Sequence, residues 1–272
     1  MDEIQGDEAQ HDEPAAAARD EGLLELAEEP GLWLPYEPKL NVFRAENFAF
    51  VTYGRSAWVH RLRLGEANLA AIVDRVEGMI ALKGLDEATW WVGELSTPEG
   101  LADELAGLGL QPDDPPEMTS LTIGSAPSGE PAVDVRRAET VEDALAAAEI
   151  DWECFGVPEA ERAARRQEVA AAWPALHAGG LQSTYLAYLD GEPAGFARAV
   201  FTQRAALLLG GATLPSARGH GVYTSLVHAR WNEAVERGTP RLAVSAGPMS
   251  APILESLGFD PIGRVRLLRQ RL

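Results

Sequence analysis

The chain has 272 residues, of which 46% are hydrophobic, and a formal net charge of −19 at pH 7. This length and apolar content predict one large or two ordinary folded domains and exclude a wholly disordered chain. The acidic balance excludes the basic surface that nucleic-acid binding requires, and the densest apolar run, residues 205–209, is too short to span a bilayer.

The N-terminal 29 residues carry eleven carboxylates against one arginine, Arg19, so more than half of the excess negative charge lies there. We expect residues 1–30 to form an acidic, disordered tail that aids solubility, with attraction of a cationic small substrate as the alternative. The segment is acidic where a secretory signal is basic and then apolar, so a cytoplasmic protein is expected. Basic residues are almost all arginine, which indicates a bacterial genome of high GC content.

Cysteine and histidine give no sign of a metal site. Cys154 is the single cysteine, and it has no partner for an internal disulfide and no ligand spacing, so we expect a buried apolar side chain and no bound metal. His177, His220 and His228 also lack partner spacing and are expected at the surface or in packing.

Strand and helix patterns alternate over residues 31–125. Alternating apolar residues predict strands, and apolar residues at a spacing of 3.6 predict helices. In chain order, the predicted elements are a β-hairpin over 48–53 and 57–62, a helix over 69–82, a strand over 89–92, a helix opened by residues 96–99 and closed by Gly107 and Gly109, and a strand over 119–123.

The turn-rich stretch at residues 126–132 is the best candidate for a domain linker, and the pattern restarts beyond it. The elements predicted there are a strand over 133–136, helices over 141–150 and 158–173, a hairpin over 185–189 and 194–201, a strand over 206–214 interrupted by Gly210 and Gly211, a helix from 222 to Gly238, a strand over 242–245, a helix over 248–257 and a strand over 262–268. This alternation predicts an α/β (α+β) fold with domains at 31–125 and 133–272.

The ends of the two halves echo each other. Residues 89–123 and 241–268 both run as a strand, a short helix that ends in Leu-Gly and an apolar residue, and a second strand. This shared order is consistent with a duplicated fold.

The stretch Arg218-Gly219-His220-Gly221 joins a predicted strand to a predicted helix. The first N–H groups of a helix are unpaired and carry the positive end of its dipole, glycines let several amides converge on one anion, and Arg218 adds a cation. These features predict a phosphate site, with an ordinary glycine-rich turn as the alternative. The loop lacks the third glycine and downstream acid of a Rossmann fingerprint and the Gly-Lys-Ser/Thr of a Walker loop.

The loop resembles the acyl-CoA site of the GNAT superfamily of N-acetyltransferases, which follows the pattern Q/R-x-x-G-x-G/A. Arg218 and Gly221 match this pattern, whereas Tyr223 stands where the family usually has glycine or alanine. The preceding strand, the following helix and the Leu257-Gly258-Phe259 ending extend the resemblance over residues 133–272. It implies two GNAT-like domains, each a mixed, mostly antiparallel sheet flanked by helices, with acetyl-CoA as the cosubstrate.

The resemblance also implies which residues meet the cosubstrate. The pyrophosphate of CoA would lie on the loop and the first helical turn, and the pantetheine arm along the end of the preceding strand. The implied binding residues are Ala212, Thr213, Leu214, Arg218, Gly219, His220, Gly221, Val222, Tyr223 and Thr224. The matching point of the first half offers Gly65 and Glu66, whose carboxylate would repel a pyrophosphate, so we expect CoA in the second half only.

Direct attack of an amine on the thioester needs a base for the amine, a donor for the oxyanion and an acid for the thiolate. Many family members place a tyrosine acid where this chain has Leu254, so Tyr223 is the nearest replacement and water the alternative. Glu153, near the expected acceptor pocket, is the candidate base, with a solvated helix-end carboxylate as the alternative. A backbone N–H near Thr213 or Leu214 is the expected oxyanion donor.

The residues and the resemblance together predict an acetyl-CoA-dependent N-acetyltransferase that acts on a small amine, without nucleic-acid or membrane partners and with a homodimer left open. A catalytically idle CoA-binding or scaffold protein is the first alternative, because the family tyrosine is missing and the strand over 206–214 carries no carboxylate. An acyltransferase that uses another acyl-CoA is the second.

Overall fold

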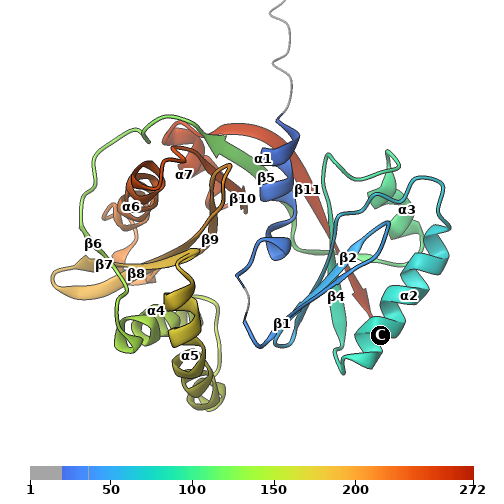
Figure 1. The fold of residues 1–272 in the computed structure, drawn as a ribbon, viewed down its shortest axis with the longest axis horizontal. Helices are drawn as coiled ribbons and strands as arrows, with labels where there is room; N and C mark the ends of the chain where they lie inside the picture. The colour runs from blue at the N-terminus through green and yellow to red at the C-terminus, as the bar shows by residue number, and fades with distance from the viewer. Residues whose placement is uncertain (1–19, 36) are drawn as a thin grey trace, which may run out of the picture.

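A computed structural model describes residues 20–35 and 37–272 and shows a mixed α/β fold, as predicted (Figure 1). The strands are β1 (Leu40–Arg44), β2 (Ala49–Tyr53), β3 (Ser56–His60), β4 (Glu87–Val92), β5 (Gln111–Ile123), β6 (Asp134–Arg137), β7 (Gln182–Leu189), β8 (Glu192–Phe201), β9 (Ala206–Thr213), β10 (Leu242–Ala246) and β11 (Asp260–Arg271). The helices are α1 (Glu21–Glu28), η1 (Pro30–Leu32), α2 (Leu69–Leu82), α3 (Leu101–Gly107), α4 (Val141–Cys154), α5 (Glu159–Gly179), η2 (Pro215–Ala217), α6 (Val222–Glu236) and α7 (Ala251–Ser256). None of these helices is long and apolar enough to cross a membrane.

All of these strands belong to one sheet, in which each half lends its final strand to the other. The order is β1-β2-β3-β4-β11-β5-β10-β9-β8-β7-β6. β5 pairs with β10, where Leu121 faces Val244, and β11 pairs with β4, where Leu268 faces Trp90. Leu121 and Leu268 are buried in the hydrophobic cores of the opposite halves. The predicted linker at 126–132 therefore separates two stretches of chain that each complete the other's core.

α1 lies inside the segment that we predicted to be disordered, residues 1–30. Its Leu23 and Leu26 are buried, and they pack against Ala243 of β10. The prediction of disorder is therefore wrong for this helix, because leucines at helical spacing bury an apolar stripe despite the acidic composition. Residues 1–19, which hold the rest of the predicted tail, lie outside the described residues.

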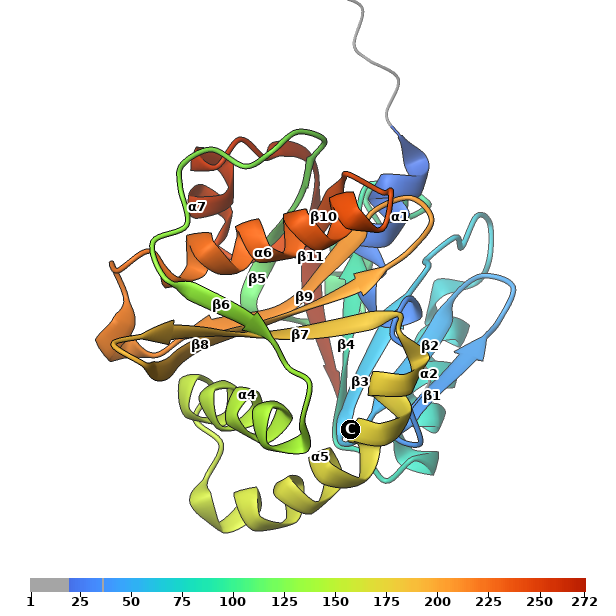
Figure 2. The same cartoon turned by 60° about the vertical axis from the view of Figure 1, so that its left-hand side comes forward.

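Helices cover both faces of the sheet in the second half (Figure 2). α6 and α7 pack on the face that carries Leu208 and Leu242, and α4 packs on the opposite face over Phe196 and Ala212. α5 has no buried residue, and arginines of α5 form ion pairs with Glu149 of α4. One face of the sheet at β9 is therefore covered by α6 and α7, and the other face by α4.

Each half contains one pair of parallel strands that separate soon after they meet. β3 and β4 pair at only two positions, and so do β9 and β10. In the second half these positions are Ala206 and Leu207 on β9, so the rest of that edge of β9 has no partner strand within the described residues. This unpaired edge is where the pantetheine arm is expected.

Candidate active site

A β-bulge interrupts β9 at Gly210. The register with β8 shifts from Gly211 opposite Ala197 to Leu209 opposite Arg198, which leaves Gly210 without a facing residue. Gly210 has a φ of +52°, a conformation that glycine adopts without steric cost. Bulges of this kind bend a strand and redirect its groups, often beside active sites.

Beyond the bulge, β9 offers an amide and a hydroxyl at its unpaired edge. The Leu214 N–H donates to the Ala194 carbonyl of β8 at 2.9 Å. Because adjacent amides along a strand point to opposite edges, the Thr213 N–H points away from β8. Thr213 Oγ1 is buried and has no hydrogen-bond partner within residues 20–35 and 37–272. Of the two expected oxyanion donors, Leu214 is therefore wrong and Thr213 stays a prediction.

The loop before α6 leaves the N-terminus of that helix without a side-chain cap. Gly219 and Gly221 have φ values of +82° and +74°, and Gly221 occupies the N-cap position. A Cβ atom on Gly221 would lie 2.6 Å from Ala132 Cβ, whereas one on Gly219 would meet nothing within 4 Å. Arg218 and His220 are exposed beside them. The helix dipole, the uncapped amides and Arg218 together suit an anion.

The corresponding helix of the first half, α2, is closed by its own side chain. Asn68 occupies the N-cap position, and its Oδ1 accepts a hydrogen bond from the Ala71 N–H at 3.2 Å. The preceding Gly65 and Glu66 are exposed. An anion at α2 would meet a capped helix and a nearby carboxylate, so the two halves differ at the same point of the fold.

Side chains also fill the place where β3 and β4 separate. The rings of His60 on β3 and Trp91 on β4 have their centroids 5.2 Å apart. A Cβ atom on Gly31 of η1 would lie 2.7 Å from His60 Nε2. Burial lowers the pKa of His60 to about 3, so this ring is neutral at pH 7. In the first half, the chain itself thus occupies the place that corresponds to the expected pantetheine position.

An acidic side chain that the sequence did not single out lies on the α4 side of β9. Asp151 Oδ2 is 3.6 Å from Arg198 Nη1. A Cβ atom on Gly210 would lie 3.4 Å from the same nitrogen, so Arg198 borders the bulge. Burial raises the pKa of Asp151, and the charge of Arg198 opposes that rise. A carboxylate with a raised pKa in this position is suited to take up a proton.

Glu153, the base candidate from the sequence, lies on a different side of α4. Its side chain is exposed, because two residues along an α-helix differ by about 200° in direction. Asp151 instead continues the row of Ala144, Ala147 and Ala148, which are buried toward the sheet. This spacing by three and four is the signal that would have identified Asp151 in the sequence.

The first half contributes side chains near Arg198. The Tyr53 hydroxyl, at the end of β2, donates to Glu37 Oε2 at 2.8 Å. Burial and then Glu37 raise the pKa of Tyr53, whereas the charge of Arg198 lowers it. Lys39, just before β1, forms an ion pair with Glu168 of α5. The two halves therefore meet through Lys39 and Glu168, on the side of β9 where the acceptor is expected.

Tyr223 stands in the first turn of α6, partly buried against the core of the second half. A Cβ atom on Gly211 would lie 3.9 Å from Tyr223 Cε2, so the ring lies beside β9 just past the bulge. Leu254, at the position of the family tyrosine, is fully buried in α7. The structure thus brings Tyr223, and no tyrosine of α7, next to the expected pantetheine strand.

The remaining expected CoA residues offer backbone groups rather than side chains. Val222 and Ala212 are buried in the core, and Thr224 is half-buried in the first turn of α6. The side chains of Val222 and Ala212 are therefore committed to packing.

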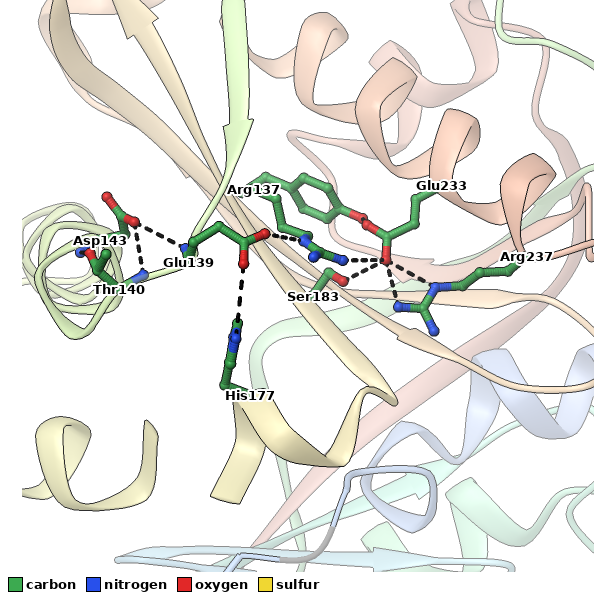
Figure 3. Close-up of polar contacts among 9 residues, drawn as sticks. Arg137, Glu139, Thr140, Asp143, His177, Ser183, Glu233 and Arg237 are labelled. Carbon is green, nitrogen blue, oxygen red and sulfur yellow. Dashed lines mark hydrogen bonds and ion pairs between the residues drawn. The ribbon is translucent and has the colours of Figure 1, made fainter. Parts of the chain in front are cut away.

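A polar network that borders a cavity of about 630 Å³ joins β7 to α6 (Figure 3). Glu233 accepts hydrogen bonds from Ser183 at 2.7 Å, from Tyr185 at 2.5 Å and from Arg237 Nη2 at 2.6 Å. Burial raises the pKa of Glu233, but these hydrogen bonds outweigh burial and hold it below its usual range. The cavity is lined by none of the expected CoA residues. Because the network satisfies its own charges, its role is to fix α6 on the sheet.

Comparison with known proteins gives a family and a fold. Residues 126–249 match the family model of the acetyltransferase (GNAT) domain. A tandem GNAT protein from the clavulanic acid biosynthesis pathway has a TM-score of 0.60 and 16% identity, over 90% of this chain and 87% of that one. A GCN5-related N-acetyltransferase from Kribbella flavida has a TM-score of 0.66 and 16% identity, over 93% and 96%. Another from Sphaerobacter thermophilus has a TM-score of 0.59 and 15% identity, over 92% and 90%.

No curated protein matches this sequence. The solved structures are less than 25% identical to the chain, so they establish its fold, and the family model establishes the domain. Residues 126–249 are thus similar to the acetyltransferase (GNAT) domain, and the two halves together have the fold of tandem GNAT proteins.

Proposed function

We propose that this protein transfers the acetyl group of acetyl-CoA to a small amine, and that only the second half binds CoA. The observation that carries this proposal is the difference between two helix N-termini. α6 is capped by Gly221, which has no side chain, whereas α2 is capped by the side chain of Asn68. An uncapped N-terminus next to Arg218 suits a pyrophosphate, and a capped one next to Glu66 does not.

The binding roles follow the chain from β9 to α6. The amides from Gly219 to Thr224 and the Arg218 guanidinium would hold the pyrophosphate, and residues 212–214 would line the pantetheine arm. Thr213 Oγ1 supports this fit, because a buried hydroxyl that has no partner among the described residues is a place for a ligand's polar group. A hydrogen bond from the Thr213 N–H to the oxyanion would stabilise the transition state by about 3 kcal/mol.

The amine must lose a proton before it attacks. For an alkylamine with a pKa of about 10, this costs about 4–5 kcal/mol at pH 7. Asp151 is better placed than Glu153 to receive that proton, directly or through water, because it lies on the sheet side of α4 and burial raises its pKa. Holding the amine and the thioester together lowers the barrier by a further ~7–11 kcal/mol.

The carboxylates around the acceptor side favour an amine that carries a second positive charge. Glu37 is buried, and its described polar partner is the Tyr53 hydroxyl. Within residues 20–35 and 37–272, no lysine or arginine forms an ion pair with Glu37, although buried carboxylates are normally paired with a cation. A second amino group on the acceptor would supply that cation while the first reacts beside Asp151.

Thiol release from acetyl-CoA with 1,4-diaminobutane and with 1-aminobutane tests both parts of the proposal. The two amines share the reacting end and differ in the second charge. We expect the diamine to have a kcat/KM higher by about tenfold, which corresponds to about 1.4 kcal/mol. Glu37→Gln should reduce this advantage, and Glu46→Gln, an exposed carboxylate of the same half, should keep it.

A catalytically idle CoA-binding protein is the alternative. It is favoured by Leu254, which is buried at the position where many family members carry the tyrosine acid. If CoA binds but no amine in a broad panel releases thiol above the buffer rate, the idle protein is the correct reading. If thiol appears only with longer acyl-CoA donors, the acetyl group is the wrong part of the proposal.

A further inference from the structure

β1 ends the sheet, and its outer edge has no partner strand among the described residues. On its inner side, the Ala45 N–H donates to the Phe48 carbonyl at 2.9 Å, where the chain turns into β2. Because N–H groups along a strand point to alternate sides, the N–H and C=O groups of Val42 and Arg44 point away from β2. Both residues are exposed, Val42 by 38%. An edge of this kind is a template for pairing with another extended chain.

The second half covers the corresponding edge with a strand of its own. The order β7-β8-β9-α6-β10 repeats β1-β2-β3-α2-β4, so β7 is the counterpart of β1. β6 pairs antiparallel with β7, and its Val135 packs against the core. Just before β6, the N–H groups of Ala132 and Val133 donate to Ser225 Oγ of α6 at 2.9 and 3.2 Å. In the part of the chain that the structure describes, no segment of the first half takes this course along β1 and α2.

A groove of about 750 Å³ lies between β1, β2 and α2. Counted from the start of each helix, Met79 of α2 corresponds to Asn232 of α6, which borders the cavity beside Val135 of β6. The groove therefore lies where the second half has β6. Its lining is mostly apolar and includes Phe43, which is 41% exposed, and Leu82, which is 84% exposed. Exposed apolar side chains that line one groove mark an interaction site.

The groove is positively charged, although the whole chain has a net charge of −19. Arg75 and Lys83 line it, and no aspartate or glutamate does. The Arg75 guanidinium lies 5.3 Å from the centroid of the Phe43 ring, at the apolar wall. Neither of these cations, nor Arg44 at the end of β1, forms an ion pair with a described carboxylate. Unpaired cations beside an apolar surface favour a ligand that carries carboxylates.

We propose that β1 and this groove form a docking site for an acidic peptide segment of a partner protein. The segment adds to β1 as an antiparallel strand, as β6 adds to β7, and its backbone pairs with the open groups of Val42 and Arg44. Its apolar side chains lie against Phe43, and its carboxylates lie beside Arg75 and Lys83. All of these residues belong to the first half, so the inference does not depend on the proposed acetyl transfer.

A second copy of this chain is a poorer occupant of the groove. Pairing of β1 with the β1 of another copy would bring the unpaired cations of both copies together, and like charges across a sheet are destabilising. An anion with an apolar tail would fill the groove but would leave the backbone groups of the edge unpaired. The three occupants therefore differ in backbone hydrogen bonding and in the oligomeric state that they produce.

A set of synthetic peptides distinguishes these occupants. The parent is acetyl-Glu-Thr-Leu-Glu-Leu-Thr-Glu-amide, and a second peptide has lysine in place of each glutamate. Two further forms of the parent are N-methylated, one on both threonines and the other on both leucines. In a strand added to β1, residues opposite Val42 and Arg44 turn their N–H groups toward β1, and residues opposite Phe43 turn theirs away. With the leucines in the groove, N-methylation of the threonines removes the hydrogen bonds to β1, and N-methylation of the leucines does not.

Calorimetric titration of the full-length protein gives the affinities. The parent peptide and its leucine-methylated form should bind with Kd values within about threefold of each other. The lysine peptide and the threonine-methylated form should bind at least about tenfold more weakly. In hydrogen–deuterium exchange, the parent peptide should protect the amides of Val42 and Arg44 and leave those of β6 unchanged.

Substitutions in the protein test the groove itself. Arg75→Gln/Lys83→Gln should weaken binding of the parent peptide by about tenfold, because the cations that face its carboxylates are lost. Leu82→Ser should weaken it by about fivefold and leave the unfolding midpoint unchanged, since Leu82 is largely exposed. Arg61→Gln is the matched control, because Arg61 is an exposed arginine of the same half that does not line the groove, and its Kd should stay within about twofold.

Absence of binding by the parent peptide up to about 1 mM would overturn the inference. Equal Kd values for the two N-methylated forms would also overturn it, since the groove would then hold an amphipathic anion and not a strand. A wild-type dimer in sedimentation that Leu82→Ser dissociates would assign the groove to a second copy. Protection confined to amides outside residues 40–44 would place the peptide elsewhere on the protein and contradict the role of β1.

Discussion

The Asp151 carboxylate lies 3.6 Å from the Arg198 guanidinium, which borders the Gly210 bulge of β9. This pair fixes a half-buried carboxylate on the side of β9 from which the proposed acceptor approaches. Asp151→Asn keeps the size of the side chain and removes its ability to take a proton. We expect kcat to fall by about 100-fold, measured as thiol release at saturating amine, with the Kd for CoA unchanged.

The role of Asp151 as a base also predicts the direction in which kcat changes with pH. Burial raises the pKa of Asp151, and a base works only when unprotonated, so kcat should rise with pH through that pKa and the variant should lack this rise. Glu142→Gln, in the first turn of α4, is the control and should keep both rate and profile. A larger loss in Glu153→Gln than in Asp151→Asn would return the role of base to Glu153.

Glu233 is expected to be the main polar support of α6 (Figure 3). Glu233→Gln removes the buried negative charge to which Ser183, Tyr185 and Arg237 donate hydrogen bonds. The free energy of unfolding, measured with urea at pH 7, should therefore fall by about 2 kcal/mol. Because the folded state lowers the pKa of Glu233, this stabilisation is lost as the pH falls below the usual glutamate range, and the two unfolding curves should converge there.

Glu236→Gln serves as the control for this measurement, since Glu236 is exposed on the same helix. It should change the free energy of unfolding by less than about 0.5 kcal/mol. Similar decreases in the free energy of unfolding for Glu233→Gln and Glu236→Gln would show that the hydrogen bonds of Glu233 do not stabilise the fold.

Burial shifts the pKa values of Glu29 and His60, both near η1, in opposite directions. Burial raises the pKa of Glu29 to about 7, against the charge of Arg63, and burial lowers that of His60 to about 3. Glu29 therefore contributes stability that is complete below its ordinary pKa of 4.5 and is lost as the pH rises through its folded-state pKa of about 7. His60 contributes stability that is complete above 6.5 and is lost as the pH falls toward 3.

Glu29→Gln should remove the first of these dependences. Relative to the wild type, its free energy of unfolding should rise by about 1–2 kcal/mol between about pH 5 and about pH 8, measured by urea unfolding. His60→Gln should gain relative stability on acidification instead. Parallel pH curves for the wild type and Glu29→Gln would contradict the burial of a titrating carboxyl at this place.

Most of the order of strands and helices could be predicted, because it depends on neighbours in the sequence, but α1 and β1 were not among the predicted elements. The alternation over 48–53 and 57–62 corresponds to β2 and β3, and the 3.6-residue spacing over 69–82 matches α2. Gly219 and Gly221, which the sequence places in the turn before a helix, take left-handed conformations. Each of these features is set within a few residues, so composition and spacing are enough to find it.

Pairing partners and side-chain directions could not be predicted in the same way. The exchange of β5 and β11 places Leu268 opposite Trp90, and no local pattern encodes a contact between residues so far apart in the chain. Asp151 and Glu153 are both acids of one short stretch, and only the direction around the helix axis separates them. Arg230 is an ordinary arginine in sequence until the fold buries it.

The most direct test of the central claim is a calorimetric titration of CoA into the wild type, Gly219→Asp and Gly219→Asn. Gly219 has a φ of +82° and open space around it, and asparagine and aspartate both tolerate that conformation. The two variants therefore differ by one negative charge at the N-terminus of α6. Gly65→Asp, before α2, adds the same charge to the first half at a φ of +55° and also has open space.

We predict that the wild type, Gly219→Asn and Gly65→Asp bind CoA with Kd values within about threefold of each other, and that Gly219→Asp binds at least about tenfold more weakly. Equal Kd values for Gly219→Asp and Gly219→Asn, or a loss of binding caused by Gly65→Asp, would contradict a pyrophosphate site at the N-terminus of α6 alone.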